Sequence, residues 1–336
     1  MRKVSIIMVN YNGVKYLGRG DLTDAVKSFL ETDYPSFEFI FVDNNSTDES
    51  IAVVKSLFQE YPQVQSKIVR NGENLGFAGG CNKGIEKAEG DYICLVNNDD
   101  KALDKNWLRE LVKVLESDEK IGAVFAKKMK WSNSSEVDAR GMTINPAGMV
   151  CESDIEDKIA PRLIWQTPVL FRRNLIEKIG GRFFDDYVIL HDDTDSSLRI
   201  WLAGYKILYV PTSIVLHKRS ATMKQLPVEF VAFHGRKNII QTLIKNYEFK
   251  NLIKWLPITL NIYLTVSLYF LLINRLDQTT ATIKALYWIM KNLRNILIKR
   301  QYIQKKLRKV SDNIIFNLMA SFNLLEIIRR RKVWPK

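Results

Sequence analysis

The feature that most constrains the fold is a series of short apolar runs, each of which ends in polar side chains. Three such runs are Val4 to Val9, followed by Asn10-Tyr11-Asn12-Gly13; Phe37 to Val42, followed by Asp43-Asn44-Asn45-Ser46; and Tyr92 to Val96, followed by Asn97-Asn98-Asp99-Asp100. Burying amides and carboxylates without partners would cost several kcal/mol. Three polar clusters in equivalent places therefore predict one shared binding site, although Ser46 and Glu49 taken alone would fit a helix capping box.

Amphipathic segments alternate with these apolar runs and with a fourth run, Ala123 to Ala126. The segments are Asp21 to Glu31, Glu49 to Glu60, Phe77 to Ala88 and Asn106 to Glu116. Alternation of strands and helices predicts an α/β fold with a mainly parallel sheet that helices cover on both faces. In such sheets ligands bind beyond the carboxyl ends of the strands. The polar clusters stand at those ends.

Composition and charge narrow the class of protein. With 336 residues, of which 46% are hydrophobic and 26% charged, the chain is long enough for a full core and a second module. Cys81, Cys94 and Cys151 have no C-x-x-C spacing, so we expect core thiols in a reducing compartment rather than disulfides or a zinc site. The net charge of +13 comes mainly from the region after Lys284, which argues against a nucleic-acid-binding surface spread over the whole chain.

The polar groups suit a nucleotide diphosphate with a divalent ion. Asp43 could accept hydrogen bonds from a base or ribose, and Asp99 is a hard oxygen ligand for Mg²⁺ or Mn²⁺. The glycine-rich segment from Gly72 to Gly80 would let the backbone approach a ligand closely. Each feature has an alternative interpretation when taken singly, because an Asp after a strand can cap a helix and a glycine-rich segment can be a turn.

Four segments together resemble the successive motifs of family 2 inverting glycosyltransferases with the GT-A fold, in particular the rhamnosyltransferase- and galactofuranosyltransferase-like branch. They are VSIIMVNYNG, FIFVDNNSTDES, NGENLGFAGGCNKGIEKAEGDYICLVNNDD and HDDTDSSLRIWLAGYKILYVPTSIVLH. The resemblance covers roughly Met1 to Tyr247, with the motifs in the family's order. It implies a GT-A fold, a nucleotide-diphospho-sugar as donor, and Mn²⁺ or Mg²⁺ as cofactor.

The resemblance also implies a donor site. Asn97-Asn98-Asp99 occupies the position of the family's D-x-D motif, with Asp99 as a metal ligand and Asn97 in place of the first Asp. His217 matches a histidine that can complete the metal shell, although a lone His after an apolar strand can also be structural. Asp100 could assist the metal or cap the following helix. The residues expected to bind the donor are Asn10, Tyr11, Asn12, Asp43, Asn74, Gly76, Asn97 and Asn98.

A second carboxylate cluster, His191-Asp192-Asp193-Thr194-Asp195, resembles the family's E-D-x-D or W-D-D-x-D motif. By that match Asp193 is the general base that removes a proton from the acceptor hydroxyl, Asp192 orients the acceptor or the base, and Asp195 is structural. The alternative is a charged helix N-terminus that interacts with the helix dipole.

Two further segments match the family on the acceptor side: Trp165 to Arg173 and Ile179 to Asp185. Trp165 could stack on a sugar or lie buried in the core. The segment from Phe233 to Asn238 resembles the R-x-N start of the helix that follows the catalytic domain in this branch.

The C-terminal third has a different character. Trp255 to Ile273 carries no charge and is long enough to cross a bilayer, but a single crossing would place the basic residues after Lys284 on the side opposite a nucleotide-using domain. A helix lying in the interface, followed by basic amphipathic helices such as Ile283 to Ile298, fits better. A soluble or oligomerising helical module is the remaining alternative.

We therefore expect a catalytic domain at 1–222, a connecting helix at 223–250 and a basic helical region at 251–336 that binds anionic lipid at the cytoplasmic face of the cell membrane. The predicted activity is metal-assisted transfer of a sugar to a lipid-linked or polysaccharide acceptor with inversion. A sugar nucleotidyltransferase is disfavoured because its G-x-G-T-R loop is absent. A non-catalytic membrane- or nucleic-acid-binding scaffold is disfavoured because Asp99 and Asp193 are both present.

Overall fold

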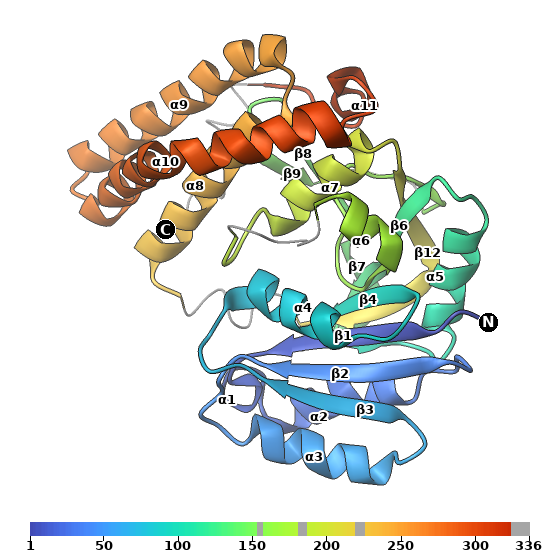
Figure 1. Ribbon diagram of the computed structural model, residues 1–336. Coiled ribbons are helices and arrows are strands. Elements are labelled where there is room, and N and C mark those ends of the chain that lie inside the picture. Colours follow the sequence, from blue (N-terminus) through green and yellow to red (C-terminus); the bar gives the residue numbers. More distant parts are fainter. Residues whose placement is uncertain (153–156, 181–186, 219–225, 324–336) are drawn as a thin grey trace.

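A computed structural model describes residues 1–152, 157–180, 187–218 and 226–323 (Figure 1). Within these residues the centre of the molecule is a ten-stranded sheet, most of it in the order β10-β12-β6-β11-β4-β1-β2-β3. Four neighbouring strands are parallel, namely β1 (Val4–Asn10), β2 (Phe37–Asp43), β3 (Gln65–Arg70) and β4 (Tyr92–Asn97). This half of the sheet confirms the predicted parallel arrangement.

The other half of the sheet is mixed. β11 (Val169–Arg172) lies antiparallel between β4 and β6 (Ile121–Lys130), and β12 (Lys206–His217) runs parallel to β6. Three short or edge strands complete it: β5 (Asp100–Ala102), β7 (Asn133–Ala139) and β10 (Ala160–Pro161). A separate hairpin is made by β8 (Met142–Ile144) and β9 (Val150–Glu152).

The strand register brings the three predicted polar clusters to one edge of the sheet. Asn10, at the end of β1, pairs with Asp43 at the end of β2, and Val9 pairs with Asn97 at the end of β4. Because parallel strands end at the same edge, side chains that are far apart in the sequence meet there.

Two hydrophobic cores cover the two faces of the sheet. Ile6 and Met8 of β1 belong to one core and Ile7 to the other, because successive side chains of a strand point to opposite faces. The first core contains α2 (Arg19–Leu30), α3 (Ser50–Glu60) and α5 (Trp107–Glu116). The second contains α4 (Gly76–Lys87), the short helix α6 (Arg173–Lys178), α7 (Asp192–Leu202) and α8 (Val228–Asn246).

The predicted capping box is wrong. Helix α3 begins at Ser50, and its N-cap residue is Glu49, which makes no side-chain capping bond. The hydroxyl of Ser46 instead accepts the backbone N–H of Asn12 at 2.8 Å, at the start of the short helix α1 (Gly13–Leu17). Ser46 therefore joins the loops that follow β1 and β2.

The C-terminal helices lie on the same side of the sheet as α8, opposite α2 and α3 (Figure 1). α9 (Phe249–Leu272) and α10 (Leu276–Tyr302) form a helical hairpin that continues into a π-helical turn, η2 (Ile303–Leu307), and the short helix α11 (Asp312–Phe316). Buried apolar residues of α10, η2 and α11 belong to the second core. The predicted domain boundary at 222 falls outside the described residues, so the division of the chain into three parts stays a prediction.

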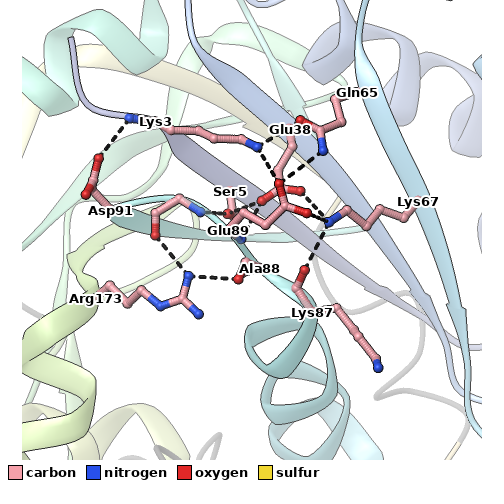
Figure 2. Close-up of polar contacts among 11 residues, drawn as sticks. Lys3, Ser5, Glu38, Gln65, Lys67, Lys87, Ala88, Glu89, Asp91 and Arg173 are labelled. Atoms are coloured by element: carbon pink, nitrogen blue, oxygen red, sulfur yellow. Dashed lines mark hydrogen bonds and ion pairs between the residues drawn. The ribbon is translucent and has the colours of Figure 1, made fainter.

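A polar network around one buried carboxylate connects the parallel strands at the opposite edge of the sheet, where these strands begin. Figure 2 shows Glu38 of β2, which is fully buried, surrounded by three donors. Its carboxylate accepts the Ser5 hydroxyl at 2.7 Å and the Glu89 backbone N–H at 2.6 Å, and it pairs with the Lys67 ammonium at 2.9 Å. The network thus connects β1, β2, β3 and the segment before β4.

Replacing Glu38 with alanine should lower the free energy of unfolding by about 3 kcal/mol, because the substitution removes the acceptor of the Ser5 hydroxyl and of the Glu89 N–H and one of the two carboxylates that pair with Lys67. Burial alone would raise the pKa of Glu38, but Lys67, Ser5 and the Glu89 N–H outweigh it and the pKa is lowered. The contribution to stability is therefore present at neutral pH and lost as the pH falls through the lowered pKa. Urea unfolding of Glu38→Ala, with the exposed Glu60→Ala as control, measures this; equal unfolding free energies for the two variants would contradict it.

Candidate active site

A chain of amide and carboxylate groups joins the three strand ends. The side-chain oxygen of Asn10 accepts Nδ2 of Asn98 at 2.8 Å, and Nδ2 of Asn10 donates to the Ser46 hydroxyl at 3.2 Å. Asp43 is fully buried; its carboxylate accepts the Ser46 N–H at 3.0 Å and lies 3.5 Å from Nδ2 of Asn10. The predicted cluster therefore forms, and Asp43 holds its neighbours from the buried side.

Asn12 and Tyr11 complete the loop after β1. Asn12 has a left-handed backbone conformation, with a φ of 49°, and its side-chain oxygen accepts the Thr47 N–H at 2.8 Å. This bond ties the loop after β1 to the loop after β2. The ring of Tyr11 is half-buried and lies 6.2 Å from the ring of Tyr16, and its contact with a ligand stays a prediction.

Part of the glycine-rich segment is helical. Helix α4 begins at Gly76, so Gly79 and Gly80 are helical. A Cβ at Gly80 would lie 2.6 Å from Val9, and one at Gly84, beyond the segment, would lie 2.4 Å from Ile7. Gly80 and Gly84 therefore allow α4 to pack closely on β1, and the approach of the segment to a ligand stays a prediction.

Gly76 itself lies at the site. Its φ is +71°, its N–H donates to Asn74 Oδ1 at 3.0 Å, and Asn44 Nδ2 donates to its carbonyl at 2.8 Å. A Cβ at this position would lie 2.1 Å from the carbonyl oxygen of Val188, in the segment that leads into α7. The first turn of α4 is therefore in contact with the chain that carries the second carboxylate cluster.

Asp99, Asp100 and His217 form a cluster with the donor set of a metal site. One potential ligand atom from each residue lies within 4.8 Å of the others, and His217 Nε2 is 3.5 Å from Asp99 Oδ2. The antiparallel pairing of β12 with β5 sets this arrangement, because it places His217 opposite Asp100. Carboxylate oxygens with an imidazole suit Mn²⁺, and the carboxylates also suit Mg²⁺. The residues present therefore fit the predicted ion.

The structure adds Asp138 of β7 to this cluster. Its Oδ2 lies 2.7 Å from His217 Nδ1, and its side chain is 4% exposed. A carboxylate that accepts the Nδ1–H of a histidine fixes the tautomer in which Nε2 carries the lone pair. The sequence around Asp138 holds no recognisable signal for this contact, because Asp138 and His217 meet only through the pairing of β7 and β12 with β6.

The structure contradicts one of the two roles expected of Asp100, that of capping the following helix. It is fully buried in β5, its Oδ1 lies 2.9 Å from the Lys128 ammonium, and its Oδ2 accepts the Asn97 N–H at 3.1 Å. Because α5 begins only at Trp107, Asp100 does not cap a helix. Lys128 also donates to the Thr167 hydroxyl at 3.1 Å.

The charge of Asp99 depends on its neighbours. Burial alone would raise the pKa of Asp99, but His217 and Lys128 outweigh this effect, so the pKa is lowered and Asp99 is anionic at neutral pH.

The second carboxylate cluster begins α7. The helix starts at Asp192, and it follows two non-glycine residues with positive φ, Leu190 at 63° and His191 at 62°. Asp193 Oδ1 accepts the Thr194 N–H at 2.6 Å. Burial raises the pKa of Asp192 to about 8, with repulsion from Asp193 adding to it, and burial raises the pKa of Asp193 to about 6.

Asp195 and Trp165 are buried and make contacts within the protein core. Asp195 is fully buried and pairs with Arg199 at 3.0 Å and Lys245 at 3.1 Å. Trp165 is 2% exposed, and its indole N–H donates to the Ser196 hydroxyl at 3.0 Å, so it supports α7 from the core instead of stacking on a sugar. Of the expected acceptor segment after Ile179, residues 181–185 lie outside the described residues.

The hairpin of α9 and α10 carries a large exposed apolar surface. α9 has 24 residues, and its most apolar stretch has a mean hydropathy of 1.6 and is 22% buried, so by length and composition the helix is a candidate membrane span. The exposed apolar residues of the hairpin include Leu264, Leu268, Tyr269, Leu272, Ile283, Tyr287, Met290 and Ile298. Lys291 and Arg294 are exposed on the same hairpin.

Solved structures with similar folds are glycosyltransferases. The Staphylococcus aureus TarS fragment 1–349 in complex with UDP-GlcNAc is 17% identical, with a TM-score of 0.60 over 94% of this chain and 89% of that one. The mannosyltransferase PcManGT from Pyrobaculum calidifontis, in complex with GDP-Man and Mn²⁺, is 18% identical, with a TM-score of 0.54 over 90% of this chain and 85% of that one. At these identities the likeness shows the GT-A fold.

Sequence comparisons agree with the fold. The O-antigen chain rhamnosyltransferase RfbN of Salmonella typhimurium is 26% identical over 66% of this chain and 68% of its own length. The probable glycosyltransferase YdaM of Bacillus subtilis is 27% identical over 66% of this chain, which spans about half, 52%, of that protein. An uncharacterized glycosyltransferase of Haemophilus influenzae is 38% identical over 30% of this chain and 37% of its own length. The model of the family described as glycosyl transferase family 2 matches residues 5–180, more than half of the chain, which therefore belongs to this family.

Proposed function

We propose that this protein transfers a hexose from a nucleotide-diphospho-sugar to a hydroxyl group of a lipid-linked or polysaccharide acceptor, with inversion at the anomeric carbon. The observation that carries the proposal is the presence of two separate acidic sites: the cluster of Asp99 with His217, and the Asp192–Asp193 pair at the start of α7. Contact between Gly76 and Val188 brings the segment before α7 to the donor side of the molecule. Membership in family 2 supports the same reaction.

The donor side is assigned to the polar strand ends. Asn10, Tyr11, Asn12, Asn74, Gly76, Asn97 and Asn98 would contact the nucleotide sugar, and Asp43 would hold Ser46 and Asn10 in place from the buried side. Asp99 and His217 would hold Mn²⁺ or Mg²⁺, which when bound would offset the negative charge of the donor diphosphate. Two structural neighbours, PcManGT and GalNAc-T7, were solved with Mn²⁺, which supports this assignment.

The acceptor side is assigned to α7. Asp193 would accept the proton of the acceptor hydroxyl as that oxygen attacks the anomeric carbon. Asp192, whose pKa is raised to about 8, would carry the proton of the carboxyl pair at neutral pH and leave Asp193 ionised. Attack from the face opposite the leaving diphosphate in a single step would invert the centre.

Relatives named O-antigen chain rhamnosyltransferases, and a putative teichuronic acid biosynthesis glycosyltransferase, place homologues of this chain in the synthesis of cell-envelope polysaccharides. Their names support a polysaccharide or lipid-linked acceptor. We assign catalysis to 1–222, a connecting helix to 223–250, and membrane attachment or self-association to 251–336.

The function is tested by incubating the full chain with UDP-, GDP- and dTDP-sugars, Mn²⁺, and lipid-linked or oligosaccharide acceptors. Transfer from at least one donor is expected, and NMR of the product should show an anomeric configuration opposite to that of the donor. A product with retained configuration would refute the single displacement. Failure of every donor to bind or react would refute the transferase assignment.

Attachment to the cytoplasmic face of the membrane is proposed to occur through the α9–α10 hairpin, whose apolar side chains would enter the interface while Lys291 and Arg294 meet anionic headgroups. Replacing Leu264, Leu268 and Leu272 together with aspartate should weaken binding to phosphatidylserine-containing vesicles roughly tenfold or more, because each buried leucine contributes about 1.5–3 kcal/mol. The whole chain is used because α10 contributes to the core. Leu103→Asp, an exposed leucine beside β5, is the control; vesicle sedimentation that is equal for both variants would contradict the proposal.

A further inference from the structure

The turn that precedes α7 is held in an unfavourable backbone conformation. Leu190 and His191 both have positive φ, at 63° and 62°, a region that side chains with a Cβ adopt reluctantly. Asp192 and Asp193 follow directly. The direction in which their carboxylates point therefore depends on whatever keeps this turn left-handed.

Asn238 of α8 makes the contacts that hold the turn. Its Nδ2 donates to the carbonyl oxygens of both Ile189 and Leu190, each at 2.8 Å. Its Oδ1 accepts Nε2 of Gln241 at 2.9 Å, which fixes the orientation of the amide. Asn238 is fully buried, so its amide depends on these protein partners rather than on water.

Other residues on the same face of α8 contact the chain before and after the turn. The Thr242 hydroxyl lies 2.6 Å from the Tyr187 hydroxyl, and Lys245 and Asn246 contact Asp195 at 3.1 Å and 2.8 Å. Positions 238, 242, 245 and 246 share one helix face. This buried polar face lies along the whole segment from Tyr187 to Asp195, and Asn238 is its contact with the turn itself.

We propose that Asn238 is a positioning residue for the Asp192–Asp193 pair: its amide fixes the left-handed turn and thereby the direction of the Asp193 carboxylate. The proposal rests on the proposed role of Asp193 as the general base. Without the amide, the carbonyls of Ile189 and Leu190 lose this donor and the turn relaxes toward negative φ, which moves the first residues of α7. A shift of about 1 Å in a reacting group can slow a reaction by about 10²-fold.

Asn238→Ala and Asn238→Asp test the proposal. Aspartate keeps the size of asparagine but cannot donate to the two carbonyls at neutral pH, so it separates hydrogen bonding from packing. Both variants should lower kcat for sugar transfer about tenfold or more, while the Kd of the nucleoside diphosphate with Mn²⁺ stays within about twofold of wild type, because the Asn238 amide bonds Ile189, Leu190 and Gln241 rather than the proposed donor residues. The matched control is Gln278→Ala. Gln278 lies in α10, and its buried side-chain oxygen accepts a hydrogen bond at 2.6 Å from Arg236, which lies in α8 like Asn238.

The outcomes distinguish this inference from the proposed function. If Asp193→Asn is inactive and a folded Asn238 variant keeps the wild-type kcat, the positioning role is overturned and the proposed base stands. An equal loss of kcat in Gln278→Ala would also overturn it, because general loosening of α8 would then explain the effect. An active Asp193→Asn would overturn the proposed base itself.

Discussion

Asp193→Asn is expected to slow sugar transfer by about 10²–10⁴-fold, the range typical of a general base, while donor affinity and melting temperature stay near wild type. Asparagine keeps the shape of the side chain but cannot accept the proton of the acceptor hydroxyl at neutral pH. The proposed donor residues lie after β1, β2 and β4 and at the start of α4, whereas the Asp193 carboxylate bonds Thr194, so the substitution removes no bond to them. Steady-state transfer, calorimetric titration with a nucleoside diphosphate, and thermal unfolding of this single variant measure all three quantities.

The alternative role of Asp193 is that of an acidic residue in the first turn of a helix, and it predicts a different result. Asparagine would then be nearly equivalent, turnover would be near normal, and the cost would be a stability loss of about 1 kcal/mol at most. A stable, donor-binding and inactive protein supports the base, whereas an active one refutes it.

The pH dependence of the wild type provides an independent check on the same residue. With a pKa raised to about 6, Asp193 becomes protonated as the pH falls below that value, and transfer should decline on the acid side. Both carboxyl groups have pKa values above their ordinary range, so they favour the folded state less as the pH rises and they ionise. Their contribution to stability should therefore decrease as the pH rises from the ordinary aspartate range to about 8, in the opposite direction to the effect of Glu38.

Asp99→Ala should remove the dependence of donor binding on Mn²⁺, weakening binding in the presence of the ion by about 100-fold, since even loss of a group that only orients a ligand costs about 10–100-fold. The backbone carbonyl of Asp99, which accepts the Lys218 N–H at 2.9 Å, is retained, so the fold should be unaffected. Titrating Mn²⁺ alone and then UDP, GDP and dTDP by calorimetry measures the effect.

Two further variants serve as a control and as an intermediate case for this experiment. Asp104→Ala removes an exposed carboxylate close in sequence and should bind Mn²⁺ like wild type. Asp138→Asn should give an intermediate loss, because the contact of Asp138 is with His217 Nδ1, at 2.7 Å, and it would act on the ion through that histidine. Unchanged Mn²⁺-dependent donor affinity in Asp99→Ala would rule out its role as a ligand.

The parts of the fold that were predictable are those in which local sequence pattern and burial agree. β1, β2 and β4 are apolar because both faces of each strand are buried, and the runs from Val4, Phe37 and Tyr92 indicate them to within a residue at their carboxyl ends. β3 was not predicted, because Gln65–Arg70 lies at the edge of the sheet and is largely polar. Antiparallel β11 between β4 and β6 also has no local signal, since strand order depends on the whole chain.

The candidate site was predictable where one motif supplies its residues and unpredictable where long-range pairing does. Asp99 with His217 and the pair at Asp192 were named from motifs that resemble a family, and the structure brings the first two together. Lys128 beside Asp100 and Asp138 beside His217 depend on the register of β6, β7 and β12. Asn238 was expected only as the start of a helix, and its contact with the turn before α7 requires the packing of that helix.

The Lys128–Asp100 pair has a consequence for the electrostatic balance of the proposed metal site. Lys128 lies 2.9 Å from Asp100 Oδ1, so the protein itself supplies a cation for this fully buried carboxylate. Asp99 instead has His217 as its neighbour, at 3.5 Å, and a divalent cation held by these two residues would offset its charge in a partly buried site, where an uncompensated charge is costly. An aspartate at position 97, where the family's motif has one, would add a further negative charge at this end of β4. The neutral amide of Asn97 therefore lowers the negative charge that a bound cation would have to offset.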